Sequence, residues 1–382
     1  MMPSSRVSLA TVFRHWFKLG TIGFGGPPAH IALLRTLCVT ENQWLSAEEF
    51  EHAVATTGLL PGPASTQLAI YCAWRVRGAL GAIVGGVCFI FPGLVMILAL
   101  TAAFFAHDPS KYLLGAALGA GAVVPAIAFS TAVQMLPASV KSVRDSRPLL
   151  IRWAFFVTAG VVTSLLAPQF VVITLLVCGL LSIALQRPTQ RSVAGMVATT
   201  GVHALALGGL GAVAWVAFKV GALSYGGGFV IIPLMQHDVV SVYHWMTGAQ
   251  FLNVVALGQI TPGPVVLTTA AVGYAAHGLS GGLLATLVAF GPSFLFILGG
   301  ASHFERLRQN LTAKAFLAGA APSVIGAIGG SSIPLGLLLA HLWQLPLLAA
   351  ALGWLLWRKG SSVGPLLVAA VLGALAATAL PV

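Results

Sequence analysis

The chain has 382 residues, of which 58% are hydrophobic and only 7% are charged, and its mean hydropathy is +0.96. A soluble domain carries roughly a quarter charged residues, so this composition excludes a water-soluble globule and predicts a chain that faces lipid over most of its area. The formal net charge of +11 would suggest nucleic-acid binding in a soluble protein. Here we assign it to cytoplasmic loops, which are enriched in Lys and Arg, and expect no nucleic-acid partner.

Apolar stretches of about 20 residues, the length that crosses a bilayer, recur along the chain. They predict an all-α polytopic membrane protein with ten to twelve transmembrane spans. The expected spans lie near residues 8–26, 50–74, 79–105, 113–136, 149–166, 168–186, 205–227, 248–274, 279–300, 314–332, 334–356 and 362–381. The start of the chain lacks an apolar core followed by a cleavage site, so we expect it to be retained.

Several features are expected to be absent. The four cysteines lie far apart with no CxxC motif or Cys/His cluster, so the sequence predicts no disulfide framework, metal site or cofactor. The eight acidic residues lie mostly in loops and form no catalytic constellation, which disfavours an enzyme. No GxxxxGK[ST] string is present, so the sequence predicts no ATP-binding machinery.

The chain contains an internal duplication. The string FKLGTIGFGG from Phe17 reappears as FKVGALSYGG from Phe218, an offset that also superposes the PGP triplets at 61–63 and 262–264. A one-residue slip then superposes Pro92 on Pro292. We therefore predict an N-terminal repeat over residues 1–186, a linker over 187–204 and a C-terminal repeat over 205–382.

The charge distribution favours inverted repeats. The first-repeat cations, including Arg14 and the cluster from Lys141 to Arg152, are expected to be cytoplasmic anchors, and the acidic stretch from Glu41 to Glu51 then falls outside. The second-repeat cations, such as Lys314 and Arg358, become cytoplasmic only if that repeat is inverted. Inversion needs an odd number of crossings between the repeat starts, whereas the span list gives an even number, so one span is miscounted or an element does not cross.

Each repeat breaks its helices twice at Gly and Pro, and broken helices at matching positions are typical of secondary transporters with a midplane site. Proline at a first helical turn leaves the following N–H groups pointing out of the helix end, which suits an anion. The alternative interpretation is that these residues only make kinks or tight crossings. The predicted substrate-binding residues at the breaks are Gly25, Gly26, Pro61, Gly62, Pro63, Gln67, Gly226, Gly227, Pro262, Gly263 and Pro264.

Three cations complete the predicted substrate site. Lys18 and Lys219 occupy equivalent positions inside apolar helices, and Arg75 ends the helix after the first PGP. A guanidinium suits a tetrahedral oxyanion. The alternatives are that the lysines extend to the membrane interface and that the arginine is a topology anchor.

Proton coupling would need a side chain that titrates near the site, and histidine is the natural choice at neutral pH. The alternative interpretation is that the candidates are solvated groups at the membrane interface. The candidates are His30, His52, Glu51 and Asp238, with Glu48, Glu49 and His237 beside them.

Three long strings resemble the signature segments of the chromate ion transporter family: GFGGPPAHIALLR from Gly23, TTGLLPGPASTQLAIYCAWRVRGALGAIVGGVCFIFPG from Thr56 and LGQITPGPVVLTTAAVGYAAHGLSGGLLA from Leu257. The resemblance covers nearly the whole chain in the family's two-repeat form. It implies antiparallel halves and a multi-pass carrier of the bacterial inner membrane. Such a carrier would export chromate with sulfate as competitor, driven by membrane potential or by proton antiport, and confer chromate resistance.

The sequence leaves rival functions open. Sulfate and chromate are both tetrahedral dianions, so a carrier for sulfate or another oxyanion remains an alternative. An anion channel would share a cationic, Gly-rich pore. Membrane lipid is the expected surrounding partner, and a homodimer is a candidate assembly.

Overall fold

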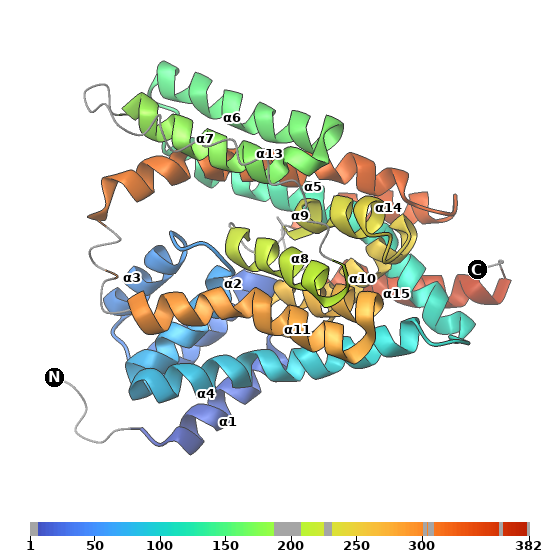
Figure 1. The fold of residues 1–382 in the computed structure, drawn as a ribbon, viewed down its shortest axis with the longest axis horizontal. Coiled ribbons are helices and arrows are strands. Elements are labelled where there is room, and N and C mark those ends of the chain that lie inside the picture. Colours follow the sequence, from blue (N-terminus) through green and yellow to red (C-terminus); the bar gives the residue numbers. More distant parts are fainter. Residues whose placement is uncertain are drawn as a thin grey trace.

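The structure is a computed structural model that describes residues 7–186, 208–224, 231–300, 304, 309–358 and 362–379. These residues form helices and connecting turns, with no strand among them (Figure 1). Within the described residues, six helical segments are long and apolar enough to cross a membrane: Ala64–Phe104, Lys111–Lys141, Arg147–Leu166, Pro168–Gln186, Val265–Gly300 and Leu311–Leu337. The predicted all-α polytopic fold is confirmed.

The helices follow one another in the same order in both repeats. The first repeat contains α1 (Leu9–Ile22), α2 (Gly26–Arg35), η1 (Thr36–Glu41), α3 (Ala47–Thr57), α4 (Ala64–Phe104), α5 (Lys111–Lys141), α6 (Arg147–Leu166), η2 (Pro168–Phe170) and α7 (Val171–Gln186). The second contains α8 (Gly209–Leu223), α9 (Ile231–Gln236), η3 (His237–Val242), α10 (Gly248–Ile260), η4 (Val265–Leu267), α11 (Thr268–Gly300), α13 (Leu311–Leu337), α14 (Gln344–Arg358) and α15 (Val363–Ala379). The predicted linker at 187–204 lies outside the described residues.

The duplication is visible in local backbone detail. The π-helical turns η1 and η3 begin 201 residues apart, and each is followed by a non-glycine residue with positive φ, Gln43 and His244. Helices α3 and α10 both start with a capping box, in which the N-cap hydroxyl and the third residue's side chain satisfy each other's backbone N–H. The same short-range signals therefore fold the same elements twice.

Two expected spans, over 50–74 and 248–274, are wrong, because each is a helical hairpin. Helix α3 ends before the first PGP and α4 begins after it, and Glu49 at the start of α3 pairs with Arg75 twelve residues beyond Pro63. The outer ends of both helices therefore lie on the same side. Gly62 and Gly263 adopt φ values of 115° and 93° at the two turns, a region that favours glycine.

The long helices α4 and α11 each reverse direction near one end. The helical geometry of α4 breaks at Arg77 and Gly78, and a Cβ on Gly81 would lie 2.4 Å from the Ala73 carbonyl oxygen. The first part (residues 64–76) thus folds back on the second part (79–104). Helix α11 repeats this break at His277 and Gly278.

Helix α1 also turns back at the first glycine break. His15 and Trp16 of α1 contact the ring of Trp44, which follows η1, so α1 and the α2–η1 segment run side by side in opposite directions. The prediction that Arg14 and the stretch from Glu41 to Glu51 lie on opposite sides is therefore wrong. Both lie at one end of the molecule, because the break reverses the chain instead of kinking a spanning helix.

The two repeats are antiparallel. Along the second parts of α4 and α11, a Cβ on Gly86 would meet the Phe294 ring, whereas a Cβ on Gly282 would meet Leu98. Residue numbers rise on one helix as they fall on the other, and these segments are equivalent in the duplication. Figure 1 shows α4 and α11 side by side with opposite colour gradients. The predicted inversion is confirmed.

Helices α5 and α13 join the repeats, because each packs on helices of the other repeat. Helix α5 lies against α14 and α15, and α13 lies against α6 and α7. Small residues permit these close approaches: an added Cβ would lie 2.1 Å from the Ala369 oxygen at Gly119, and 2.0 Å from the Ser323 oxygen at Gly160.

Candidate functional site

The helix breaks of the two repeats meet in the interior. The backbone N–H of Gly263 donates to the carbonyl oxygen of Gly23 across 2.9 Å. A Cβ on Gly62 would lie 3.0 Å from the Gly221 oxygen, and a Cβ on Gly93 would lie 2.2 Å from the Pro262 oxygen. Each PGP turn therefore touches the other repeat, which places the predicted residues at 61–63 and 262–264 at one junction.

The first glycine break faces the second PGP turn. Gly25 and Gly26 have φ values of 99° and 72°, and α2 starts at the second of them. A Cβ on Gly26 would lie 3.7 Å from the Val265 side chain, the residue that follows the second PGP. The predicted residues Gly226 and Gly227 lie outside the described residues.

Buried polar atoms without a partner gather in the segments around this junction. Gln67, Ser293 and Thr66 are fully buried, and each carries an oxygen that no group of the described structure pairs. Such an atom costs about 1–3 kcal/mol when it is left unpaired, so these groups favour a water molecule or a polar ligand beside them. The polar atoms of this kind near the breaks are Thr66 Oγ1, Gln67 Oε1, Ser224 Oγ, Gln259 Nε2 and Ser293 Oγ.

Two of these side chains come from different repeats and face the same point. The position that a Cβ on Gly62 would take lies 2.8 Å from Gln67 Nε2 and 3.4 Å from Ser293 Oγ. Gln67 Nε2 also donates to the Pro61 oxygen across 2.7 Å, which fixes the side chain against the turn. Sequence reasoning missed Ser293 and Ser224; the superposition of Ser293 on Gly93 was the one available signal.

His30 links the two breaks of the first repeat. It is 1% exposed, its Nε2 lies 2.9 Å from the Gly23 oxygen, and its Nδ1 lies 3.2 Å from Ser65 Oγ in the first turn of α4. The ring packs edge-on against Phe89. Among the predicted proton-coupling candidates, His30 is the one that the structure brings to the junction.

The other coupling candidates lie in ion pairs away from the turns. Glu51 pairs with Arg35 at 2.7 Å on the exposed surface, and His52 lies 3.9 Å from Glu48. Asp238 pairs with Lys219, and both side chains are about 15% exposed.

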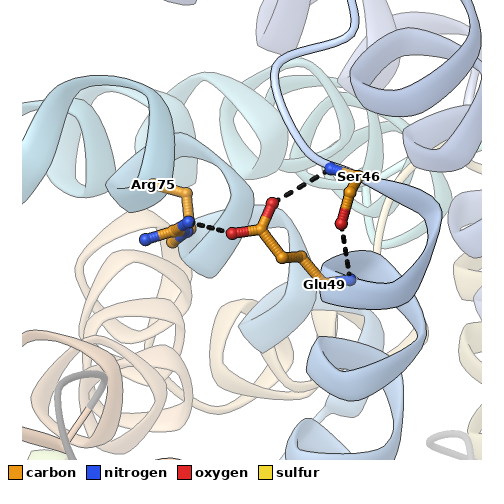
Figure 2. Close-up of polar contacts among 3 residues, drawn as sticks. All are labelled: Ser46, Glu49 and Arg75. Atoms are coloured by element: carbon orange, nitrogen blue, oxygen red, sulfur yellow. Dashed lines mark hydrogen bonds and ion pairs between the residues drawn. The ribbon is translucent and has the colours of Figure 1, made fainter. Parts of the chain in front are cut away.

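In the described part of the chain, none of the three predicted cations pairs with a group of the PGP turns. Lys18 is exposed on α1, and Lys219 pairs with Asp238 and lies over the Trp215 ring. Arg75 pairs with Glu49 at the outer end of the hairpin (Figure 2), about 18 Å along the helix from Pro63 at 1.5 Å per residue. The described junction is therefore built from neutral groups and helix ends.

A pocket of about 460 Å³ opens at the opposite end of the molecule from Glu49 and Arg75. It lies between the end of α4 and the start of α10. Gln250, the equivalent of Glu49 in the second repeat, lines it together with Asn253 and His341. The outer ends of the two helical hairpins thus differ: the first carries the Glu49–Arg75 ion pair, and the second borders this pocket.

Antiparallel repeats, helices that break in the interior and a polar junction between the repeats define a multi-pass membrane transporter. The sequence profile of the chromate transporter family matches residues 10–183 and 211–378, so the chain belongs to that family. This membership also confirms the expectation of a transport protein that is not an enzyme.

Named relatives agree with this assignment. The chromate transport protein of Cupriavidus metallidurans is 32% identical over 86% of this chain and 82% of its own length, and that of Pseudomonas aeruginosa is 31% identical over 86% and 81%. The uncharacterized transporter YwrB of Bacillus subtilis is 31% identical and matches 42% of this chain over 81% of its own length. No solved structure matches this chain.

Proposed function

We propose that this protein is a secondary transporter of the bacterial inner membrane that exports chromate by alternating access and so confers chromate resistance. Family membership and the names of its relatives support chromate as the cargo. The antiparallel repeats support a mechanism in which one repeat moves against the other around a fixed site.

The site lies at the junction of the two PGP turns. The observation that carries this assignment is the convergence of buried polar groups from both repeats at the Gly62 turn, the Gln67 amide Nε2 from the first and the unpartnered Ser293 hydroxyl from the second. Hydroxyl and amide donors, together with the helix that starts after Pro63, suit the oxygens of a tetrahedral anion. Sulfate has the same shape and charge, so we expect it to compete.

The membrane potential is sufficient to drive export. Moving two negative charges outward across about 100 mV releases about 4–5 kcal/mol, twice the value for one charge. That free energy corresponds to a concentration gradient of about three decades.

The first test is chromate uptake into everted inner-membrane vesicles, comparing the wild type with Gln67→Ala and Ser293→Ala. We expect chromate affinity to fall about tenfold or more in each variant, because a hydrogen bond to a charged group contributes about 1.5–3 kcal/mol. The thermal stability of Ser293→Ala should be unchanged or higher, since it removes an unpartnered buried hydroxyl. Gln67→Ala should be less stable than the wild type, because it also removes the hydrogen bond to the Pro61 oxygen and leaves a cavity.

The matched control is Ser142→Ala, which removes an exposed hydroxyl at the end of α5. This variant should transport chromate as the wild type does. Excess sulfate should inhibit uptake, and unlabelled chromate loaded inside the vesicles should accelerate exchange, as expected for a carrier. Flux without saturation or exchange would instead identify an anion channel. Unchanged affinity in both variants would move the site away from the junction.

A further inference from the structure

The charge of a dianion at the junction needs a positive partner. The described residues bordering the two PGP turns supply hydroxyls, amides and helix ends, while Lys18, Lys219 and Arg75 are held elsewhere. Burying a double negative charge without a cation is costly, even where helix ends contribute partial positive charge. A titratable group that gains a proton when the anion arrives would remove this cost.

His30 has the required position. Since the Gly23 oxygen can only accept a hydrogen bond, Nε2 carries the proton and Nδ1 accepts from the Ser65 hydroxyl. If a proton adds to Nδ1, that nitrogen donates to Ser65 Oγ instead. The Ser65 hydroxyl hydrogen is then free to turn toward an anion at the start of α4.

Among the described residues, no other charged or titratable group contacts His30. Its own helix carries Arg35, which pairs with Glu51. The titratable groups on the two helices packed against it are Arg14, His15 and Lys18 on α1, and Tyr71, Cys72, Arg75, Arg77 and Cys88 on α4. None of these makes a hydrogen bond or ion pair with the imidazole, so its charge responds mainly to the occupant of the junction.

The second repeat lacks this arrangement. The residues equivalent to His30 and Ser65 are Ile231 and Val266, both apolar and buried. If His30 and Ser65 served only to hold the repeat together, we would expect polar residues at the equivalent positions of the second repeat. The polar pair occurs instead in the first repeat alone. This asymmetry indicates one protonation site for each substrate site.

We propose that His30 takes up a proton from water when the dianion binds, so that chromate crosses the membrane together with one proton. This inference rests on the proposed function and names the proton as the ion that is transported with chromate. The occupied carrier then moves one net negative charge instead of two. Because the protonated form binds the anion better, affinity falls as pH rises, by at most about tenfold per pH unit for one proton.

The test is calorimetric titration of the purified full-length protein with chromate and with selenate, which stays a dianion while chromate itself titrates. Each titration is repeated in two buffers that differ in ionisation enthalpy, between about pH 5 and pH 8, the range in which histidine changes charge. The difference in heat gives the protons taken up for each anion bound. We expect uptake that approaches one proton in the wild type over part of this range.

His30→Gln should bind selenate more weakly, with an affinity independent of pH and with no proton uptake. His30→Asn serves if the first variant does not fold, and His15→Gln is the control that should behave as the wild type. Absence of proton uptake in the wild type, or equal uptake in a folded His30 variant, would refute the coupling and leave chromate transport intact. A wild type that binds neither anion would overturn the proposed function and this inference with it.

Discussion

Single glycines decide how closely the two repeats approach. Gly62 combines a positive φ with neighbours on two sides, because an added Cβ would lie 2.8 Å from Gln67 Nε2 and 3.0 Å from the Gly221 oxygen. Glycine is required here both for the turn and for the close contact between repeats. The residue that shapes the turn therefore also leaves room at the proposed site.

Gly62→Ala should reduce chromate uptake into everted vesicles by at least about tenfold, because the new methyl group strains the turn by about 1–3 kcal/mol and displaces Gln67. Gly291→Ala is the matched control, since its added methyl group meets nothing within 4 Å. Equal uptake in Gly62→Ala and the wild type would show that the turn is not the site.

At the scale of elements, the first hairpin carries an ion pair that the second lacks. Glu49 closes the capping box of α3 and also accepts from Arg75 (Figure 2), whereas Gln250 closes the box of α10. The Ser46 backbone N–H and the Arg75 guanidinium hold the pKa of the Glu49 carboxyl below its usual value. The cap and the ion pair can therefore be separated by substitution.

Glu49→Gln keeps the capping box and removes the ion pair, so we expect a loss of stability below about 1 kcal/mol, as for exposed pairs. Glu49→Ala also removes the side chain's half of the box and should be less stable than Glu49→Gln, by up to about 1 kcal/mol. The measurement is thermal unfolding in detergent at several pH values.

The depressed pKa of Glu49 fixes the sign of the pH effect. Its contribution is present above the unfolded pKa of about 4.5 and is lost as pH falls through the lower folded value. The difference between the wild type and Glu49→Gln should therefore shrink on acidification. A difference that grows at low pH would contradict this assignment.

At the scale of the whole molecule, one end carries most of the described basic residues. Arg14, Arg75 and Lys141 lie at the same end as Glu41, since the two hairpins return to it and α4 and α5 each cross once. From the positive-inside tendency we expect this end to face the cytoplasm. The equivalent end of the second repeat then faces outward.

Cysteines at equivalent exposed positions test this topology. In a cysteine-free background, Glu41→Cys should react with a membrane-impermeant thiol reagent in everted vesicles, and Val242→Cys should react in intact cells. Both residues are exposed, and they are 201 positions apart. Labelling of both from the same side would contradict inverted repeats.

The sequence by itself determined the properties that depend on composition and local pattern. These are residence in a membrane, the duplication, and the positions of the breaks, because apolar length, repeated strings and Gly-Pro chemistry are read along the chain. It also predicted inversion, from the placement of Lys and Arg.

Only the tertiary structure decided which breaks face each other and which segments turn back. Apolar length is the same for a spanning helix and for two short helices joined at PGP, so the sequence predicts one span over 50–74 where the structure has a hairpin. Likewise, Lys18 and Arg75 looked equivalent to site residues until their surroundings were known, and Ser293 became significant only when α11 was placed against Gly62. The facing breaks depend on contacts between distant residues, such as Gly62 with Gly221 and Gly23 with Gly263, and the turned-back segments depend on pairs such as Glu49 with Arg75. No local pattern encodes such contacts.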